Sequence, residues 1–232
     1  MSSWHSKPFA AGQPPLPAKA SPPLVCYVTD RKALRGEKTP AALLERIRAA
    51  VVASVDWVQI REKDLTAREL LALVKQAIAL GPARIIVNDR LDVALAAGAA
   101  GVHLGHASVP VREAVESCRR GNAAADFLLG ASCHSLEGAR AAESAGASYV
   151  YFGPVYETPS KIPFGKPHGV EELAEVTRVL HIPVIAIGGV NESNAVECIR
   201  AGAAGIAAIR MIQDARDAPG LKTAIDAIHR LP

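Results

Sequence analysis

Three polar side chains alternate through residues 59–63, directly after a short apolar run. Alternation along an extended strand would put Gln59, Arg61 and Lys63 on one face. A guanidinium fork and an ammonium group suit a polyphosphate, and a carboxamide suits the polar edge of a ring. An exposed strand end with solvated charges explains the same pattern, so these residues alone leave both interpretations open.

An asparagine and an aspartate follow the next apolar run. Asn88 directly precedes Asp89, and an aspartate at a strand tip is a good oxygen ligand for Mg²⁺. Asp89 could instead cap the following helix, a common role for Asp. The two roles are compatible only if the carboxylate faces the ligand. After the fourth run, His106 is a candidate for ligand contact, whereas His103 inside the run is expected to pack or bridge rather than catalyse.

Hydroxyl groups and one further cation come later in the chain. Ser132 ends the fifth run and can donate a hydrogen bond to a phosphate or a ring. The segment after the sixth run contains Thr158, Ser160 and Lys161, which together form a predicted anion clamp. The length and the Gly and Pro content of this segment predict a loop over the site.

Two adjacent glycines, Gly188 and Gly189, follow the seventh run. Glycine lets backbone N–H groups approach a phosphate closely, and the following Asn191 is expected to cap a helix. Barrels frequently bind phosphate between loops seven and eight. Ile209 and Arg210, at the end of the eighth run, are therefore expected to complete a phosphate site with the two glycines.

Short apolar runs that alternate with Ala-rich helical patterns must position these residues. Eight runs joined by helices predict parallel pairing through right-handed crossovers, and the number eight favours a closed barrel over an open doubly wound sheet. We predict an α/β fold, a single parallel eight-stranded (β/α)8 TIM barrel at residues 24–232, after a disordered Pro- and Ala-rich tail at residues 1–23. The predicted strands are 24–29, 57–60, 84–87, 101–104, 127–130, 149–152, 183–187 and 205–209. The predicted helices include 41–52, 67–79, 111–119, 136–144, 170–180, 194–200 and 221–230.

Composition narrows the class of protein. The chain has 232 residues, within the range of one barrel, and 50% of them are hydrophobic, which suits strands buried on both faces. A net charge of +3 without a basic block gives nucleic-acid binding little support. No apolar run reaches the roughly 18 residues that suggest a membrane span. Scattered cysteines without a CxxC pair predict free thiols in a reducing, cytoplasmic compartment, and these are Cys26, Cys118, Cys133 and Cys198.

Taken together and in order, these segments resemble the thiamine phosphate synthase family and its relatives, the thiazole tautomerases. The synthase joins 4-amino-2-methyl-5-hydroxymethylpyrimidine diphosphate to thiazole phosphate and releases diphosphate. The resemblance spans roughly residues 24–212, and its motifs are specific jointly rather than singly. The matching segments are 27–30, 59–63, 88–90, 101–105, 153–155, 158–161 and 186–189.

The resemblance implies roles for the candidate residues. The diphosphate substrate would be held by Gln59, Arg61, Lys63, Asn88 and Lys161, with Asp89 on Mg²⁺ and Ser132 on the pyrimidine side. The thiazole phosphate would be held by Thr158, Ser160, Gly188, Gly189 and the backbone of Ile209 and Arg210. Arg61, Lys63, Lys161 and Ser132 would be the catalytic residues, and the expected partners are the two substrates and a second copy in a homodimer, with no nucleic acid and no membrane.

Three positions depart from the family pattern and keep alternatives open. Ser108 stands where the synthases usually have an aspartate as second Mg²⁺ ligand, and Arg210 stands where they usually have serine. Pro154 stands where the tautomerases have their proposed acid–base histidine. The alternatives to a synthase are an isomerase of a thiazole carboxylate phosphate, with His106 or His134 as proton carrier, and a non-catalytic binder of thiamine precursors.

Overall fold

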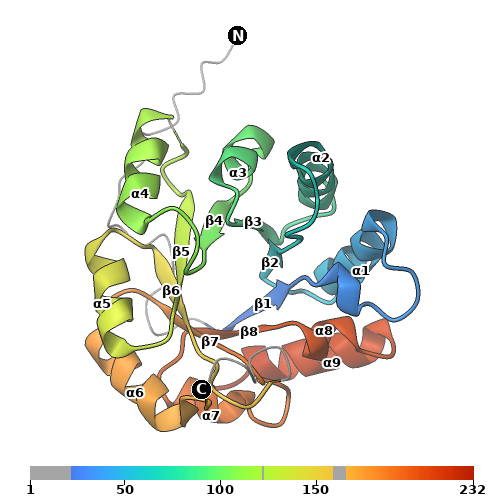
Figure 1. The fold of residues 1–232 in the computed structure, drawn as a ribbon. Coiled ribbons are helices and arrows are strands. Elements are labelled where there is room, and N and C mark those ends of the chain that lie inside the picture. The colour runs from blue at the N-terminus through green and yellow to red at the C-terminus, as the bar shows by residue number, and fades with distance from the viewer. Residues whose placement is uncertain (1–21, 122, 159–165) are drawn as a thin grey trace.

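The strands of this chain close into a barrel. The computed structural model describes residues 22–121, 123–158 and 166–232. In this part of the chain eight parallel strands pair in chain order, and the pairing of Leu24 with Gly205 joins the last strand to the first (Figure 1). The strands are β1 Leu24–Val28, β2 Trp57–Ile60, β3 Arg84–Asn88, β4 Gly101–Leu104, β5 Leu128–Cys133, β6 Tyr149–Phe152, β7 Val184–Ile187 and β8 Gly205–Ala208.

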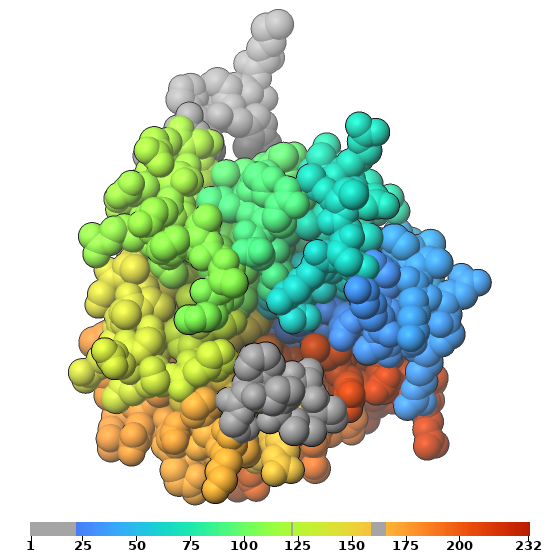
Figure 2. All heavy atoms as spheres, in the orientation of Figure 1, coloured from blue at the N-terminus to red at the C-terminus, as the bar shows by residue number. Residues whose placement is uncertain are grey.

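Helices surround the barrel and follow the same circular order. The surface of the face drawn in Figure 2 runs from the blue segment around α1, through green α3 and α4, to orange and red α6 to α9. A short 3-10 helix, η1 Arg31–Ala33, precedes the first α-helix. The α-helices are α1 Pro40–Val52, α2 Ala67–Ile78, α3 Leu91–Ala97, α4 Val111–Arg120, α5 Leu136–Ser144, α6 Gly169–Val179, α7 Ala195–Arg200, α8 Arg210–Gln213 and α9 Ala218–His229.

The helix α2 shows how local sequence sets these elements. Its N-cap Thr66 and the third helical residue, Glu69, form a reciprocal capping box that pairs two backbone N–H groups at the helix start. Leu70, Leu73, Val74 and Ala77 then recur at helical spacing and are all buried. This buried stripe therefore fixes which side of α2 faces the barrel, while the charged and amide side chains of the helix are exposed.

Two layers of core hold the barrel. The larger layer lies between the strands and the helices, and a smaller layer fills the barrel interior. In the interior layer, Tyr149 and Tyr151 alternate along β6 and lie fully buried beside Trp57. The rings of Trp57 and Tyr149 meet edge to face with centroids 4.9 Å apart. The interior is therefore filled with side chains, and only the ends of the strands are open to a ligand.

The predicted fold class is confirmed, while several element ends differ by a residue and α9 begins at Ala218 rather than at residue 221. Strand β5 begins one residue later than predicted and continues to Cys133, because its small residues, Gly130 and Ala131, stay in the ladder against β4 and β6. Helix α8 follows β8 immediately, whereas the sequence predicted only one helix in this region. The predicted tail at residues 1–23 lies outside the described residues as far as residue 21. None of the described helices is both long and apolar enough to span a membrane.

Candidate active site

The carboxyl ends of β2 and β3 bring two predicted residues into contact. Gln59 is 2% exposed, and its Nε2 donates a hydrogen bond to Oδ1 of Asn88 at 3.0 Å. The Oε1 atom of Gln59 is buried and has no hydrogen-bond partner among the described residues. A buried acceptor without a partner is costly, so a ligand with an N–H or O–H donor would stabilise this amide.

Arg61 and Lys63 stand at the end of β2 without acidic partners. Neither side chain forms an ion pair within 4.0 Å with another described residue, whereas Arg31, Arg84 and Arg90 each contact a carboxylate. Arg61 is half-buried and Lys63 is exposed. Two cations without an acidic partner, two residues apart after one strand, are available to bind an anion, although an exposed Lys63 is equally consistent with a solvated charged surface.

Asp89 has a strained backbone and an unpaired carboxylate. Its φ is 68°, in the left-handed region, and its backbone N–H donates to the carbonyl of His103 at 2.8 Å. The N-cap of α3 is Arg90 rather than Asp89, so the alternative interpretation of Asp89 as a helix cap is wrong. The exposed carboxylate of Asp89 makes no hydrogen bond or ion pair with another described residue. Asp92, in the first turn, is instead the partner of Arg90.

Ser108 is used by its own loop. Its Oγ accepts a hydrogen bond from the backbone N–H of Gly105 at 2.7 Å, and its N–H donates to the carbonyl of Gly105 at 3.1 Å. His106 lies exposed between them. Within the described residues, no three His, Cys, Asp or Glu side chains are grouped to hold a metal ion. Asp89 nevertheless fits the usual mode of Mg²⁺ binding, in which one or two carboxylates share the ion with substrate phosphates.

Ser132 is held from inside the barrel. Nε2 of His103 lies 2.8 Å from Oγ of Ser132, and Nδ1 of His103 lies 3.2 Å from Oη of Tyr149. Burial lowers the pKa of His103 to about 3, so its ring is neutral near pH 7. His103 therefore bridges two hydroxyl groups, as the sequence predicted, and leaves Ser132 half-buried at the end of β5.

The loops after β6 and β7 pack directly on each other. A Cβ atom at Gly188 would lie 2.5 Å from Cα of Pro154, and one at Gly189 would lie 2.6 Å from the carbonyl oxygen of Glu157. Both glycines have positive φ, 93° and 69°. The need for glycine thus comes at least partly from loop contact, which the sequence did not reveal. Thr158 lies on this β6 loop, and the predicted residues Ser160 and Lys161 lie outside the described residues.

One helix cap near the glycines was predicted wrongly. Helix α7 has Asn194 as its N-cap, whereas Asn191 opens the preceding turn by accepting a hydrogen bond from the N–H of Ser193. Nδ2 of Asn194 donates to the carbonyl of Gly189 at 3.1 Å. Asn194 therefore connects the glycine segment to α7. A second asparagine three residues after Asn191 was an equally good N-cap candidate, and it was overlooked in the sequence analysis.

Helix α8 places Ile209 and Arg210 at the end of β8. Ile209 is the N-cap and Arg210 the first helical residue. Gln213, 6% exposed, fastens this helix: its Oε1 accepts from Oη of Tyr27 at 2.9 Å, and its Nε2 donates to the carbonyl of Asp30 at 2.9 Å. Such a short helix is not stable alone, so these contacts to β1 hold it in place.

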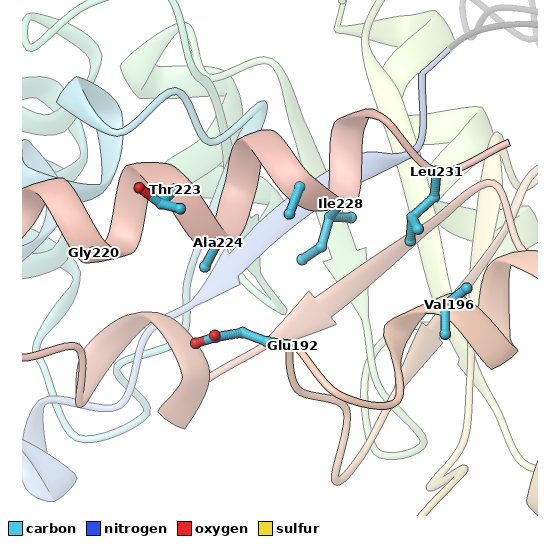
Figure 3. A pocket seen from close by; sticks show the side chains of 8 residues that line it. Glu192, Val196, Gly220, Thr223, Ala224, Ile228 and Leu231 are labelled. Atoms are coloured by element: carbon cyan, nitrogen blue, oxygen red, sulfur yellow. The ribbon is translucent and has the colours of Figure 1, made fainter.

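Two hollows lie away from the predicted site residues. One, of about 350 Å³, lies between α9 and the start of α7, with Glu192 and Thr223 near one end and Val196 and Leu231 near the other (Figure 3). The other, of about 560 Å³, lies between α1 and the segment after α8. Neither is lined by a predicted site residue.

The described geometry defines a (β/α)8 barrel in which Arg61 and Lys63 after β2 and Asp89 after β3 make no ion pair with another described residue. Residues 25–212 match the sequence profile described as Thiamine monophosphate synthase. The thiamine-phosphate synthase of Roseiflexus sp. strain RS-1 is 39% identical over 217 residues, 92% of this chain and 88% of that protein. That of Anaeromyxobacter dehalogenans strain 2CP-C is 42% identical over 172 residues, 73% of this chain and 75% of that protein.

A solved structure agrees with the sequence matches. Thiamine phosphate pyrophosphorylase from Pyrococcus furiosus superposes with a TM-score of 0.77 at 32% identity, covering 90% of this chain and 96% of that one. The chain belongs to the thiamine monophosphate synthase family. The predicted family is therefore confirmed, and the comparisons support thiamine phosphate synthesis over the two alternatives that the sequence left open.

Proposed function

We propose that this protein condenses 4-amino-2-methyl-5-hydroxymethylpyrimidine diphosphate with thiazole phosphate to give thiamine phosphate and diphosphate. One observation carries the proposal: among the described residues, unpaired Arg61 and Lys63 follow β2 and unpaired Asp89 follows the neighbouring β3, while Oε1 of Gln59 at the end of β2 is buried without a partner. Cations, a metal-binding carboxylate and a buried acceptor are what a diphosphate joined to an aminopyrimidine requires.

The two substrates would bind at different strand ends, the diphosphate substrate mainly at β2 and β3 and the thiazole phosphate at β6, β7 and β8. Arg61, Lys63, Asn88 and Lys161 would bind the diphosphate, with Gln59, Ser132 and His106 nearer the pyrimidine. The exocyclic amine of the pyrimidine could then donate to the unpaired Oε1 of Gln59. The thiazole phosphate would contact the segments after β6, β7 and β8, through Thr158, Ser160, Gly188, Gly189, Ile209 and Arg210.

Mg²⁺ is the cofactor that we propose, with Asp89 as its ligand. When bound, Mg²⁺ would neutralise charge on the diphosphate and so make it a better leaving group. Ser108 offers only a neutral oxygen, and that oxygen already accepts from the N–H of Gly105. The protein would therefore contribute little Mg²⁺ affinity beyond Asp89, and the diphosphate would supply most of the remaining ligands.

The residues of the chain would act by binding and orientation. The bond between the pyrimidine methylene carbon and the diphosphate oxygen breaks, and a bond from the thiazole nitrogen to the same carbon forms. Arg61 and Lys63 would stabilise the negative charge of the departing diphosphate. Holding the two substrates in line for the reaction would supply the remaining rate acceleration. The step needs no general base, which agrees with the neutral, fully buried state of His103.

The decisive experiment measures diphosphate release by the full chain with both substrates and Mg²⁺. Release should require both substrates and fall strongly in Asp89→Ala, whereas Asp92→Ala is a matched control because Asp92 pairs with Arg90 outside the proposed site. Absence of release at high Mg²⁺ would overturn the proposal. Isomerisation of a thiazole carboxylate phosphate without metal would support the tautomerase alternative, and ligand-induced stabilisation without turnover would support the binder alternative.

The compartment and assembly remain proposals as well. We propose a cytoplasmic enzyme, because the cysteines Cys26, Cys118, Cys133 and Cys198 are free thiols and all are buried. Burial raises the pKa of each of these thiols, which keeps them protonated and unreactive. A homodimer is the predicted assembly, and light scattering of the purified chain tests it.

A further inference from the structure

A buried carboxylate lies between the two unpaired cations of β2 in the sequence. Glu62 follows Arg61 and precedes Lys63, yet its side chain turns away from solvent and is 6% exposed. Neither cation pairs with it. Its cationic contact is with Arg31 of the β1 loop, whose Nε lies 3.6 Å from Oε2 of Glu62. The role of Glu62 must therefore be sought in what it holds on β1.

Glu62 and Thr29 form a hydrogen-bonded connection that ends on the backbone of Arg61. Oγ1 of Thr29, which is fully buried, donates to Oε1 of Glu62 at 2.7 Å. The same Oγ1 accepts from the backbone N–H of Arg61 at 2.9 Å. The backbone N–H of Arg31 also donates to Oε1 of Glu62, at 3.1 Å. We call these contacts of Thr29 and Glu62 the Thr29–Glu62 clasp.

The direction of these bonds makes the clasp specific. The carboxylate of Glu62 can only accept, so the hydroxyl proton of Thr29 must point toward it. That leaves a lone pair of Thr29 directed to the N–H of Arg61. The backbone N–H of Thr29 in turn donates to the carbonyl of Gln59 at 2.9 Å. The clasp thus extends the pairing of β1 and β2 beyond the last residues of both strands.

The clasp is maintained against a desolvation cost. Burial raises the pKa of Glu62 above its ordinary value, even though Thr29 and the N–H and guanidinium of Arg31 favour the charged form. Desolvation is the largest cause of this shift, ahead of the hydrogen bonds from Thr29 and Arg31. A carboxyl group that is buried against this penalty, and is connected through Thr29 to the backbone of an unpaired cation, points to a role in positioning that cation.

We propose that Glu62 and Thr29 are positioning residues that fix the backbone of Arg61, and with it the directions in which Arg61 and Lys63 present their charges to a diphosphate. This inference rests on the proposed function. Long cationic side chains lose much conformational freedom when they bind an anion, and a fixed backbone reduces that loss.

If Glu62 acted only through its negative charge, replacing it would strengthen anion binding rather than weaken it. A negative charge near an anion site repels the anion, so neutralising it should tighten binding. Asp64 provides the comparison, because it is a carboxylate in the same loop that pairs with Arg31 and Lys32 and has no bond to Thr29 or to Arg61. Neutralising Asp64 changes the charge of the loop while leaving both bonds of the Thr29 hydroxyl in place, and breaking the clasp tests positioning.

The experiment titrates inorganic pyrophosphate into the full-length protein by calorimetry. Thr29→Val keeps the size of the side chain but removes both bonds of Oγ1, and we expect about tenfold weaker pyrophosphate binding, the lower end of the effect of groups that orient ligand-binding side chains. Glu62→Gln should also weaken binding, despite removing a negative charge. Asp64→Asn should bind as the wild type does or more tightly.

A second measurement separates the clasp from the proposed function. Amide hydrogen exchange of Arg61 should accelerate in Thr29→Val and not in Asp64→Asn. Unchanged exchange in Thr29→Val, or pyrophosphate binding within twofold of wild type in both clasp variants, overturns the inference. If exchange accelerates in Thr29→Val but the wild type binds no pyrophosphate, the clasp exists and the proposed function fails. The positioning role then fails with it.

Discussion

Replacing Asp89 with glycine should separate the backbone strain at this position from the function of the Asp89 carboxylate. Asp89 is one of two non-glycine residues with positive φ in the described part of the chain, and the other is Ser54 at φ 73°. A left-handed backbone costs a residue with a Cβ roughly 1–2 kcal/mol, and Asp tolerates it better than Ala. Glycine removes that cost but loses about 0.5–1 kcal/mol more conformational entropy on folding.

The balance of these effects gives the expected magnitudes. Asp89→Gly should change the free energy of unfolding by about 0 to +1 kcal/mol, whereas Asp89→Ala should lower it by about 0.5–1 kcal/mol. For a chain of this size 1 kcal/mol shifts Tm by about 2–4 °C. Both variants should lose Mg²⁺-dependent diphosphate release, because both lack the carboxylate. Ser54→Gly should gain comparable stability and keep full activity, because Ser54 lies in the turn before β2, at the opposite end of that strand from Arg61 and Lys63.

The assay combines urea denaturation with diphosphate release measured against Mg²⁺ concentration. An Asp89→Gly variant that is destabilised by more than about 1 kcal/mol would refute the assignment of strain, since glycine fits a φ of 68°. A variant that keeps the wild-type dependence on Mg²⁺ would refute the metal role of Asp89. The combination that we expect, equal or higher stability with lost activity, is one that general misfolding does not produce.

Three further predictions concern the residues that support the site. Gln213→Leu should lower the free energy of unfolding by about 2–3 kcal/mol, because Tyr27 and Asp30 lose their hydrogen-bond partner. It should also raise KM for thiazole phosphate more than KM for the diphosphate substrate. Tyr27→Phe, which removes one of these bonds, should lower the free energy of unfolding by only about 1 kcal/mol. Burial lowers the pKa of His103 from 6.5 to about 3, so its contribution to stability is complete above pH 6.5 and is lost as pH falls toward 3. Urea titrations near pH 7 and pH 5 should therefore show that the free energy of unfolding falls less in His103→Gln than in the wild type. The difference should be at most about 1.4 kcal/mol per pH unit. An equal fall in the two proteins would contradict a neutral His103 in the folded state. Gly130→Ala should destabilise the chain by about 3 kcal/mol, because the new Cβ would lie 2.2 Å from Cζ of Tyr149, and a change below about 1 kcal/mol would mean that Tyr149 can move aside.

The fold followed from the sequence because its signals are local and repeated. Each short apolar run is buried on both faces in a parallel sheet, and eight repetitions leave few alternatives to closure. Helix α8 escaped prediction because four residues carry too little periodicity to register. Its stability comes from Gln213 and its contacts to β1, almost the full length of the chain away. A contact of that separation has no signature in a single sequence.

The candidate site was predicted unevenly for a similar reason. Residue type and strand position were enough to nominate Arg61, Lys63 and Asp89 as candidates, because each carries a charge at a strand end. They did not suffice for Thr29 and Glu62, since the sequence presents Glu62 as one more charged residue in an exposed segment. The structure shows it 6% exposed and bonded to another strand. Gly188 and Gly189 were identified correctly as special, but the loop after β6 explains their need for glycine as directly as a phosphate does.

Three departures from the lowest-energy arrangement coincide at the carboxyl ends of β2 and β3. Asp89 has a left-handed backbone, Oε1 of Gln59 is buried without a partner, and Glu62 is a buried carboxylate whose pKa is raised by desolvation. Each alone has an ordinary explanation, as Ser54 shows, because its positive φ serves only a turn between a helix and a strand. Their coincidence at one place has no such explanation, since selection for stability alone would have removed at least one of the three. Local costs that gather at one place indicate that a ligand compensates them there. A diphosphate with Mg²⁺ and an aminopyrimidine would compensate two of the three directly, by ligating Asp89 and by donating to Gln59, and would bind the cations that Glu62 helps to position.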